Sequence, residues 1–273
     1  MTLNINGELI DLDKVQVAGI LNVTEDSFFD GGRYLSENQA LKQAEKLLAD
    51  GADFIDIGGQ STRPDSKFLS ADAELQRLIP VVKAVKKEFP QSRLSVDTFW
   101  AKVAEEAVNE GVGMINDISG GSIDKKMFET VGRLKVPYVL MHMRGTPQTM
   151  GQFTDYKDLI LEINRYFSQK IRELREFGVN DILLDPGFGF SKTIEQNYEL
   201  MKNLDLLNLF KLPLYVGISR KGMIWKPLGI TPDEALTGTS VLNFYALQKG
   251  AKFLRVHDVK EARQVIKIWE LLG

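Results

Sequence analysis

The chain of 273 residues contains no cysteine. This absence excludes disulfide bonds and metal sites built on thiolates, and it agrees with a reducing compartment. A strong excess of either charge is also missing, because 34 lysines and arginines face 37 aspartates and glutamates. The formal charge of -3 does not give the broad basic surface of a nucleic-acid binder. A small molecule is therefore the expected partner, and a nucleic acid is not.

Long apolar runs are missing as well. The first ten residues have neither the basic segment nor the apolar stretch of a signal peptide, and no run approaches about 18 uninterrupted apolar residues. We therefore expect no membrane span and a cytoplasmic location. Hydrophobic residues make up 44% of the chain, enough to bury one large core, and we expect a single domain over residues 1–273.

Short apolar segments alternate with helical patterns along the chain, after an Asn6-Gly7 pair that predicts a small N-terminal β-hairpin. Strands are expected at 17–21, 54–57, 94–96, 114–115, 138–141, 182–184, 214–216 and 253–256. Helices are expected at 38–49, 71–89, 101–109, 125–133, 156–177, 193–204, 233–249 and 259–271. This alternation predicts an α/β fold of parallel βαβ units, and eight such units close into a (β/α)8 TIM barrel. A doubly wound sheet is the alternative.

The lengths of the connections indicate where a site would lie. Connections from helix to strand are short and carry glycine where a helix C-cap favours it. Several connections from strand to helix are long and polar, at 24–37, 58–70, 142–155 and 219–232. These long loops would gather at the carboxyl ends of the strands, where TIM barrels keep their active sites.

A polar residue stands at the end of nearly every expected strand. Any one of them could be a helix N-cap or a turn residue, but the set as a whole indicates a binding site. The members are Asn22, Asp56, Asp97, Asn116, Asp117, His142, Asp185, Ser219, Lys221, Arg255 and His257.

Two parts of this set suggest different ligand groups. Arg255 and His257 lie two residues apart on the last strand, so both side chains face the same way and suit an anion such as phosphate. The alternative is that His257 bonds to neighbouring backbone and Arg255 pairs with a surface carboxylate. Asp97, Asn116 and Asp185 offer acceptors and one amide, which suit a flat heterocycle rich in N–H and C=O groups. Each of these three could instead cap the helix that follows it.

The first strand runs directly into the polar segment GILNVTEDSFFDGGRY, residues 19–34. A plain connection would need only a few turn residues, so this density of polar side chains indicates a ligand-binding segment. The segment DPGFGF, residues 185–190, is ambiguous, because its glycines fit a phosphate-binding loop and an ordinary turn equally well.

Eight segments resemble, in order, the motifs of the dihydropteroate synthases: GILNVTEDSFFDGG, GADFIDIGGQSTRP, SVDTFWA, INDISGG, LMHMRGTPQTM, ILLDPGFGFSK, GISRK and LRVHDV. The resemblance runs from about residue 15 to about residue 262. It implies the joining of 6-hydroxymethyl-7,8-dihydropterin diphosphate to 4-aminobenzoate, which gives 7,8-dihydropteroate and diphosphate. Sulfonamides are implied as mimics of 4-aminobenzoate, Mg²⁺ as the cofactor and a homodimer as the assembly.

The resemblance also implies roles for matching residues. The pterin-binding set would be Asp97, Asn116, Ile118, Met141, Asp185, Phe190, Gly217 and Lys221. The diphosphate would lie against Asn22, Arg63, Arg255 and His257, with Asn22 also contacting the metal. The aminobenzoate would lie against Thr62, Arg63, Pro64 and Lys221. The residues implied in catalysis are Asp97, Asp185, Lys221 and Arg63.

The implied reaction is SN1-like: diphosphate leaves, helped by Mg²⁺ and by the cations Arg63, Arg255 and His257, and the arylamine then attacks. Residues 24–34 and 58–70 would close over the site as lids. Two alternatives remain open. A methyltetrahydrofolate methyltransferase needs no diphosphate anchor, and a non-catalytic pterin-binding homologue should have lost site residues. The sequence departs from the usual motifs at Glu25, Phe29, Gln60, Asp65 and Gly222.

Overall fold

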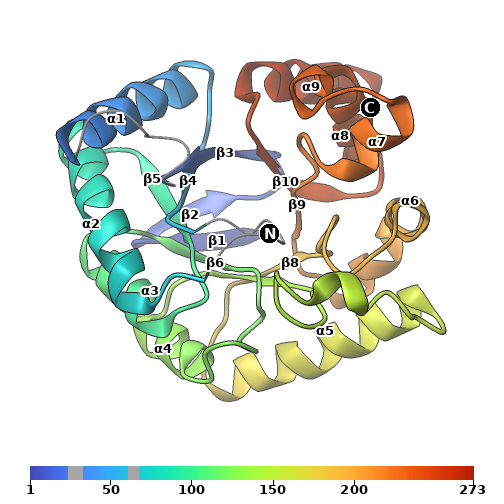
Figure 1. Ribbon diagram of the computed structural model, residues 1–273, viewed down its shortest axis with the longest axis horizontal. Coiled ribbons are helices and arrows are strands. Elements are labelled where there is room, and N and C mark those ends of the chain that lie inside the picture. Colours follow the sequence, from blue (N-terminus) through green and yellow to red (C-terminus); the bar gives the residue numbers. More distant parts are fainter. Residues whose placement is uncertain (24–32, 61–67) are drawn as a thin grey trace.

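The computed structural model describes residues 1–23, 33–60 and 68–273. Its parallel strands close into a barrel in the order β10-β3-β4-β5-β6-β7-β8-β9 (Figure 1). The barrel strands are β3 (Gln16–Asn22), β4 (Phe54–Gly58), β5 (Arg93–Asp97), β6 (Met114–Asp117), β7 (Tyr138–Met141), β8 (Ile182–Asp185), β9 (Leu214–Val216) and β10 (Ala251–Val256). The prediction of a TIM barrel is confirmed, and the doubly wound alternative is wrong.

The expected N-terminal hairpin is present. Strands β1 (Thr2–Ile5) and β2 (Glu8–Asp11) pair antiparallel around Asn6 and Gly7, whose φ angles of 51° and 88° fit a tight hairpin turn. The hairpin buries apolar side chains against residues that point into the barrel, including Phe54 and Phe253. It therefore closes the amino-terminal end of the barrel and leaves the carboxyl end for a site.

Helices surround the barrel (Figure 1). Those that follow the expected pattern are α1 (Arg33–Ala49), α2 (Ala71–Glu88), α3 (Ala101–Asn109), α4 (Met127–Leu134), α5 (Leu159–Glu176), α6 (Ile194–Lys202), α8 (Leu236–Gln248) and α9 (Val259–Leu272). Their apolar faces pack on the outer faces of the strands in one continuous core. Within the described ranges, no helix is long and apolar enough to cross a membrane.

One helix was not expected. Helix α7 (Gly222–Leu228) lies inside the segment that the sequence predicts as a loop. Its pattern could not be recognised, because the helix is only seven residues long and contains Pro227. It begins directly after Lys221, which occupies its N-cap position. Short 3-10 helices are also present: η2 (Met150–Gln152) between β7 and α5, η3 (Leu204–Phe210) between α6 and β9, and η4 (Pro232–Glu234) between α7 and α8. Helix α7 matters for the site because it fixes the backbone direction at Lys221.

The interior of the barrel changes from apolar to polar along the strands. Near the hairpin it holds side chains such as Phe54, Met114 and Val139. Two residues further along β4 and β6, on the same face of each strand, stand Asp56 and Asn116. This polar layer forms the floor of the candidate site.

Candidate active site

An arginine and two carboxylates occupy the polar layer. Arg255 donates from Nε to Asp56 Oδ2 at 2.5 Å and from Nη2 to Asp97 Oδ2 at 2.8 Å. Asp56 is fully buried, and it also accepts hydrogen bonds from Ser95 Oγ and, at 3.1 Å, from Asn116 Nδ2. The alternative of a surface partner for Arg255 is therefore wrong. Its partners are interior carboxylates, which hold the guanidinium group in one orientation.

Asp97 ends β5 at the level of the barrel mouth. In the strand register it lies opposite Gly58 and next to Asn116. Burial raises the pKa of Asp97 to about 7, although the neighbouring Arg255 acts to lower it. A ligand that donates N–H bonds to this carboxylate would favour its ionised form.

Asn116 carries an acceptor with no bonding partner. Its side chain is 2% exposed, and its Nδ2 is held by Asp56. Among the described residues, no donor reaches its Oδ1. A buried acceptor without a partner is costly, so this atom is suited to accept a hydrogen bond from a ligand.

Asp185 ends β8 and lies level with Met141 in the register. Its Oδ1 accepts the backbone N–H of Gly187 at 2.8 Å, which turns the chain sharply after the strand. Burial raises the pKa of Asp185, and Lys221 opposes that shift. Among the described residues, no hydrogen bond engages the second oxygen of this carboxylate, which could accept from a donor on a ligand.

Lys221 approaches the site from the start of α7. Its Nζ donates to the carbonyl of Phe188 and lies 4.7 Å from the centre of the Phe190 ring. Burial lowers the pKa of Lys221 to about 8, against the effect of Asp185. The lysine is thus a cation close to its titration point, between a carbonyl and an aromatic face.

An apolar wall flanks these polar groups. Ile118, Met141 and Phe190 are all buried and belong to one cluster with Phe99 and two further methionines. The structure therefore brings together the residues that the resemblance assigns to the pterin ring. A side chain at Gly217 would lie 3.6 Å from the Cβ of Arg255, which places this glycine beside the same floor. Their roles in pterin binding stay predictions.

His257 differs from the expectation of a cation. Its Nδ1 lies 3.1 Å from Ser219 Oγ, and its own backbone N–H donates to that oxygen at 3.2 Å. Burial lowers the pKa of His257 to about 4, and the nearby Arg255 lowers it further. Without a bound anion the ring is therefore neutral near pH 7. A diphosphate beside it would favour the charged form, so its role in helping diphosphate to leave stays a prediction.

Some of the predicted polar residues point away from the mouth. Asp117 follows Asn116 on β6, so it faces the helices, where it accepts from Tyr138 Oη at 2.6 Å and from Ser119 N at 2.7 Å. Arg220, which stands between the predicted Ser219 and Lys221, pairs with Asp258 at 2.7 Å and with Asp233 at 3.2 Å on the surface. Three other predicted groups lie outside the described residues: Thr62, Arg63 and Pro64. Glu25, Phe29 and Asp65 lie outside them too, as does most of both expected lids.

Of the two remaining departures from the usual motifs, Gln60 makes the more specific contacts. It is buried, its Nε2 donates to Glu74 Oε2 at 2.9 Å, and its Oε1 accepts from Leu69 N at 2.9 Å. Gly222 starts α7, where an added side chain would meet the stem of Lys226 at 3.4 Å.

A protein-only metal site is not found. The part of the chain that the structure describes holds no group of three or more His, Cys, Asp and Glu residues that could bind a metal ion. Asn22 is exposed at the end of β3, and a side chain built at Gly58 would lie 3.6 Å from its Oδ1 and 4.0 Å from Asp97 Oδ2. Mg²⁺ is commonly held by one or two protein oxygens together with substrate phosphates and water. These oxygens therefore fit Mg²⁺ only together with diphosphate.

Two residues that support the site carry little signal in the sequence. Ser95 supports Asp56 from the middle of an apolar strand, where a buried serine was itself a weak signal. Lys192 is 8% exposed and holds the loop that carries Phe190. The sequence around Lys192 does not predict its burial, because a lysine that follows a glycine-rich turn is normally exposed.

Comparisons with known proteins agree with this geometry. Residues 18–257 match the family described as pterin binding enzyme. The dihydropteroate synthase of Escherichia coli is 42% identical over 272 residues, which cover 99% of this chain and 96% of that protein. A crystal structure of the Yersinia pestis dihydropteroate synthase with a sulfonamide drug complex superposes with a TM-score of 0.93 at 42% identity, covering 100% of this chain and 99% of the other. A Thermus thermophilus dihydropteroate synthase in complex with 4-aminobenzoate gives a TM-score of 0.90 at 35% identity, with full coverage of both chains. The chain therefore belongs to the pterin-binding enzyme family and, within it, to the dihydropteroate synthases.

Proposed function

We propose that this barrel condenses 6-hydroxymethyl-7,8-dihydropterin diphosphate with 4-aminobenzoate, and that the pterin lies on the polar floor described above. The observation that carries the proposal is the buried Oδ1 of Asn116, which has no partner among the described residues and lies on the strand next to Asp97. Solved relatives with 4-aminobenzoate or a sulfonamide bound, at 35% and 42% identity, support the same substrates.

The pyrimidinone edge of a pterin complements this floor. It presents several N–H donors in one plane, and Asp97, Asn116 and Asp185 present acceptors. The ring faces would pack on Ile118, Met141 and Phe190. Donors on the ligand would satisfy the buried oxygens, so binding would offset the cost of their burial.

The diphosphate end would lie toward Asn22, Arg255 and His257. Among the described residues, Nη1 of Arg255 has no ion-pair or hydrogen-bond partner, so it can donate to a phosphate oxygen. Its charge is already offset by Asp56 and Asp97, which leaves much of the diphosphate charge to other groups. Mg²⁺, held by Asn22 and the diphosphate, would supply that neutralisation. Arg63 is a second predicted contributor.

The chemistry needs no covalent intermediate with the protein. The C–O bond to the pterin methylene breaks, and its electron pair leaves with diphosphate. Negative charge on Asp97 and Asp185 would favour the cation that forms on the pterin. The arylamine nitrogen of 4-aminobenzoate then attacks the methylene carbon, a C–N bond forms, and the nitrogen loses a proton. Lys221 holds one wall of the cleft through Phe188 and would contact the ring carbonyl.

Release of diphosphate tests the proposal. The purified protein, given the pterin diphosphate, should release diphosphate over many turnovers only when 4-aminobenzoate is added, and faster with Mg²⁺. Release without 4-aminobenzoate at an equal rate would contradict the condensation. Methyl transfer from methyltetrahydrofolate to a corrinoid protein would favour the methyltransferase, and pterin binding without any turnover would favour the non-catalytic homologue.

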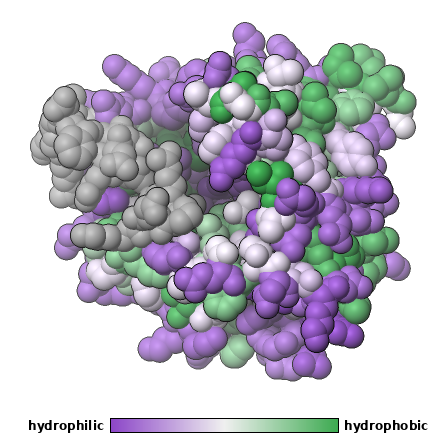
Figure 2. Space-filling view, turned by 45° about the vertical axis from the view of Figure 1, so that its right-hand side comes forward, coloured by the Kyte–Doolittle hydropathy of each residue, from purple (hydrophilic) through white to green (hydrophobic). Residues whose placement is uncertain are grey.

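A homodimer is also proposed. Helix α8 exposes Leu236, Val241 and Tyr245 while it buries Ala246 and Leu247 against the barrel. A helix that is apolar on both faces is normally covered on both. Figure 2 shows apolar side chains gathered at the upper right of its view. Sedimentation should give a dimer that Val241→Asp converts to a monomer, whereas Leu161→Asp, at an exposed position on α5, should leave it unchanged.

The single domain over residues 1–273 and the cytoplasmic location stay predictions that follow from composition alone.

A further inference from the structure

The loop after β8 has an unusual backbone. Gly187, Gly189 and Ser191 have φ angles of 71°, 80° and 45°, so three alternate residues occupy the left-handed region. Ser191 is not a glycine and is strained there. A side chain at position 187 would lie 2.0 Å from the carbonyl oxygen of His142, so the loop also packs tightly on the end of β7. Such a conformation persists only where surrounding contacts hold it.

Two lysines donate hydrogen bonds to the backbone carbonyls of this loop. Lys221 binds the Phe188 carbonyl from the site side. Lys192 is buried, and its Nζ donates to the carbonyls of Gly187 at 3.0 Å and Phe190 at 3.1 Å. The third contact of Lys192 Nζ is His142 Nδ1, at 3.1 Å. Lys192 therefore binds both ends of the turn from Gly187 to Phe190, and this turn positions the Phe190 ring in the apolar wall.

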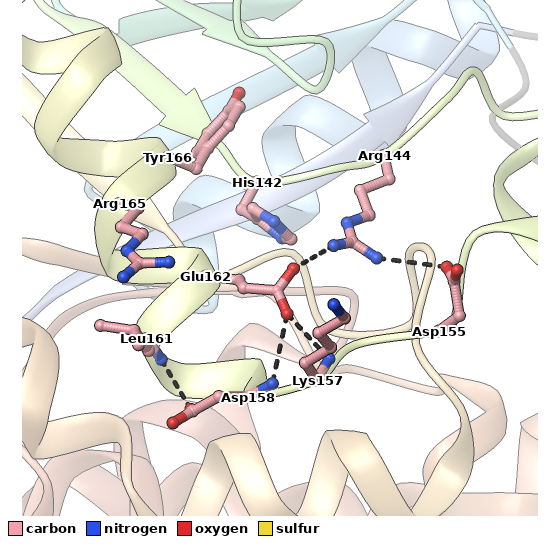
Figure 3. A pocket seen from close by; sticks show the side chains of 9 residues that line it. All are labelled: His142, Arg144, Asp155, Lys157, Asp158, Leu161, Glu162, Arg165 and Tyr166. Atoms are coloured by element: carbon pink, nitrogen blue, oxygen red, sulfur yellow. Dashed lines mark hydrogen bonds and ion pairs between the residues drawn. The ribbon is translucent and has the colours of Figure 1, made fainter.

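His142 is well suited to accept this bond. Burial lowers its pKa well below the usual range, and the neighbouring Lys192 and Arg144 lower it further, so the ring is neutral. Its ring packs edge-on against Tyr166 of α5, with 4.9 Å between the ring centres. His142 also lines a cavity of about 600 Å³ beside α5, where Figure 3 shows Arg144 between Glu162 and Asp155. The ion pair of Arg144 with Glu162 ties the loop after β7 to this helix.

The loop after β7 also contacts the loop after β8 directly. Arg144 N donates to Ser191 Oγ at 2.9 Å, and the hydroxyl of Tyr156 lies 3.4 Å from the same oxygen. The guanidinium group of Arg144 stacks over the Tyr156 ring at 3.8 Å. Helix α5 is thus linked through Arg144 to Ser191 in the loop after β8. In the same loop, Lys192 binds Gly187 and Phe190.

We propose that Lys192 is a positioning residue for the pterin site: by binding the carbonyls of Gly187 and Phe190 and the ring of His142, it fixes the Phe190 wall at the distance that a pterin ring requires. This inference rests on the proposed function. Lys192 itself touches no substrate. Its loss should therefore weaken pterin binding through Phe190, and through Asp185, whose carboxylate accepts the N–H of Gly187.

The absence of cysteine allows a direct chemical test. Lys192→Cys introduces the only thiol of the chain. Alkylation of the unfolded variant with 2-bromoethylamine, followed by refolding, restores an ammonium group on a side chain of lysine length, whereas iodoacetamide adds a neutral amide. Wild-type protein taken through the same steps is the reference. Lys86 provides a matched control, because its Nζ also holds two backbone carbonyls, Pro90 at 3.1 Å and Ser92 at 3.0 Å, in the connection from α2 to β5.

Calorimetric titration with pteroic acid gives the readout, together with steady-state rates. We expect Lys192→Cys to raise the Kd at least tenfold, aminoethylation to restore it to within about threefold of wild type, and acetamide to leave the loss in place. KM for the pterin diphosphate should rise more than kcat falls. Lys86→Cys should lower the unfolding temperature without changing the Kd.

A Kd within twofold of wild type in Lys192→Cys would overturn the inference, as would a loss that aminoethylation fails to reverse although the unfolding temperature recovers. If the cysteine variant does not fold, Lys192→Met fills the same volume without donors, and wild-type pterin affinity in that variant would equally overturn it. Failure of the wild-type protein to bind pteroic acid at all would instead refute the proposed function.

Discussion

Replacement of Asn116 by leucine tests the floor of the site most sharply, because it separates pterin binding from folding. Asn116→Leu keeps the size of the side chain and removes the Oδ1 that has no partner in the described part of the chain. It also removes one donor to Asp56, but that carboxylate keeps its bonds to Ser95 and Arg255. The free energy of unfolding should therefore fall by only about 1 kcal/mol, the usual net worth of one hydrogen bond.

The loss of pterin affinity should be larger. A ligand N–H left unpaired against leucine costs about 1 to 3 kcal/mol. At about 1.4 kcal/mol for each factor of ten, this corresponds to a rise in Kd of about 5- to 150-fold. Titration calorimetry with pteroic acid measures the affinity, and urea unfolding measures the stability.

Ser95→Ala is the matched control. It removes another partner of the same carboxylate, on the side of Asp56 away from Asn116 Oδ1, so it should cost comparable stability and leave the Kd unchanged. Unchanged affinity in a folded Asn116→Leu protein would refute the placement of the pterin on this floor. An equal loss of affinity in both variants would show that the effect comes from disturbance of Asp56 alone.

Two further predictions concern the charges of the site, and a third concerns the aminobenzoate pocket. Because burial raises the pKa of Asp97 to about 7, folding takes up a proton at this carboxylate. As pH rises from about 4 to about 7, the free energy of unfolding of the wild type should therefore fall relative to that of Asp97→Asn. Parallel pH profiles of the two proteins in urea unfolding would contradict this. Arg255→Met leaves two interior carboxylates without their cation and should destabilise the protein by about 3 to 5 kcal/mol at pH 8. Part of this stability should return at pH 5, because the carboxylates take up protons. A loss that does not depend on pH would contradict the role of the ion pairs. Labelled 4-aminobenzoate should bind weakly to the free protein and tightly with Mg²⁺ and diphosphate, whereas equal affinity would show that its pocket exists beforehand.

The periodicity of the sequence was sufficient to predict the barrel and the level of the site. Strand ends could be located because apolar runs stop at Asn22, Asp97 and Asp185, and parallel strands bring their carboxyl ends to one face. The Asn6-Gly7 turn was equally plain, since few other pairs supply positive φ at two successive positions. Short helices are harder, and α7 was missed because seven residues with Pro227 carry almost no periodic signal.

The partners of the charged groups could not be predicted, because they depend on contacts between distant strands. Arg255 meets Asp56, 199 residues away, only after the barrel closes. The neutral state of His257 follows from burial beside Arg255, and the burial of Lys192 from the path of a loop with three positive φ angles. Local sequence contains none of these facts. It did contain the alternation that sends Asn116 to the mouth and Asp117 to the helices.

The most direct measurement is identification of the product by mass spectrometry. The purified protein is incubated with 6-hydroxymethyl-7,8-dihydropterin diphosphate, ¹³C-labelled 4-aminobenzoate and Mg²⁺, with Asp185→Ala as the inactive reference. We expect labelled 7,8-dihydropteroate in amounts equal to the diphosphate released, and almost none from the variant. Diphosphate release without labelled dihydropteroate, or equal product from the Asp185→Ala protein, would contradict it.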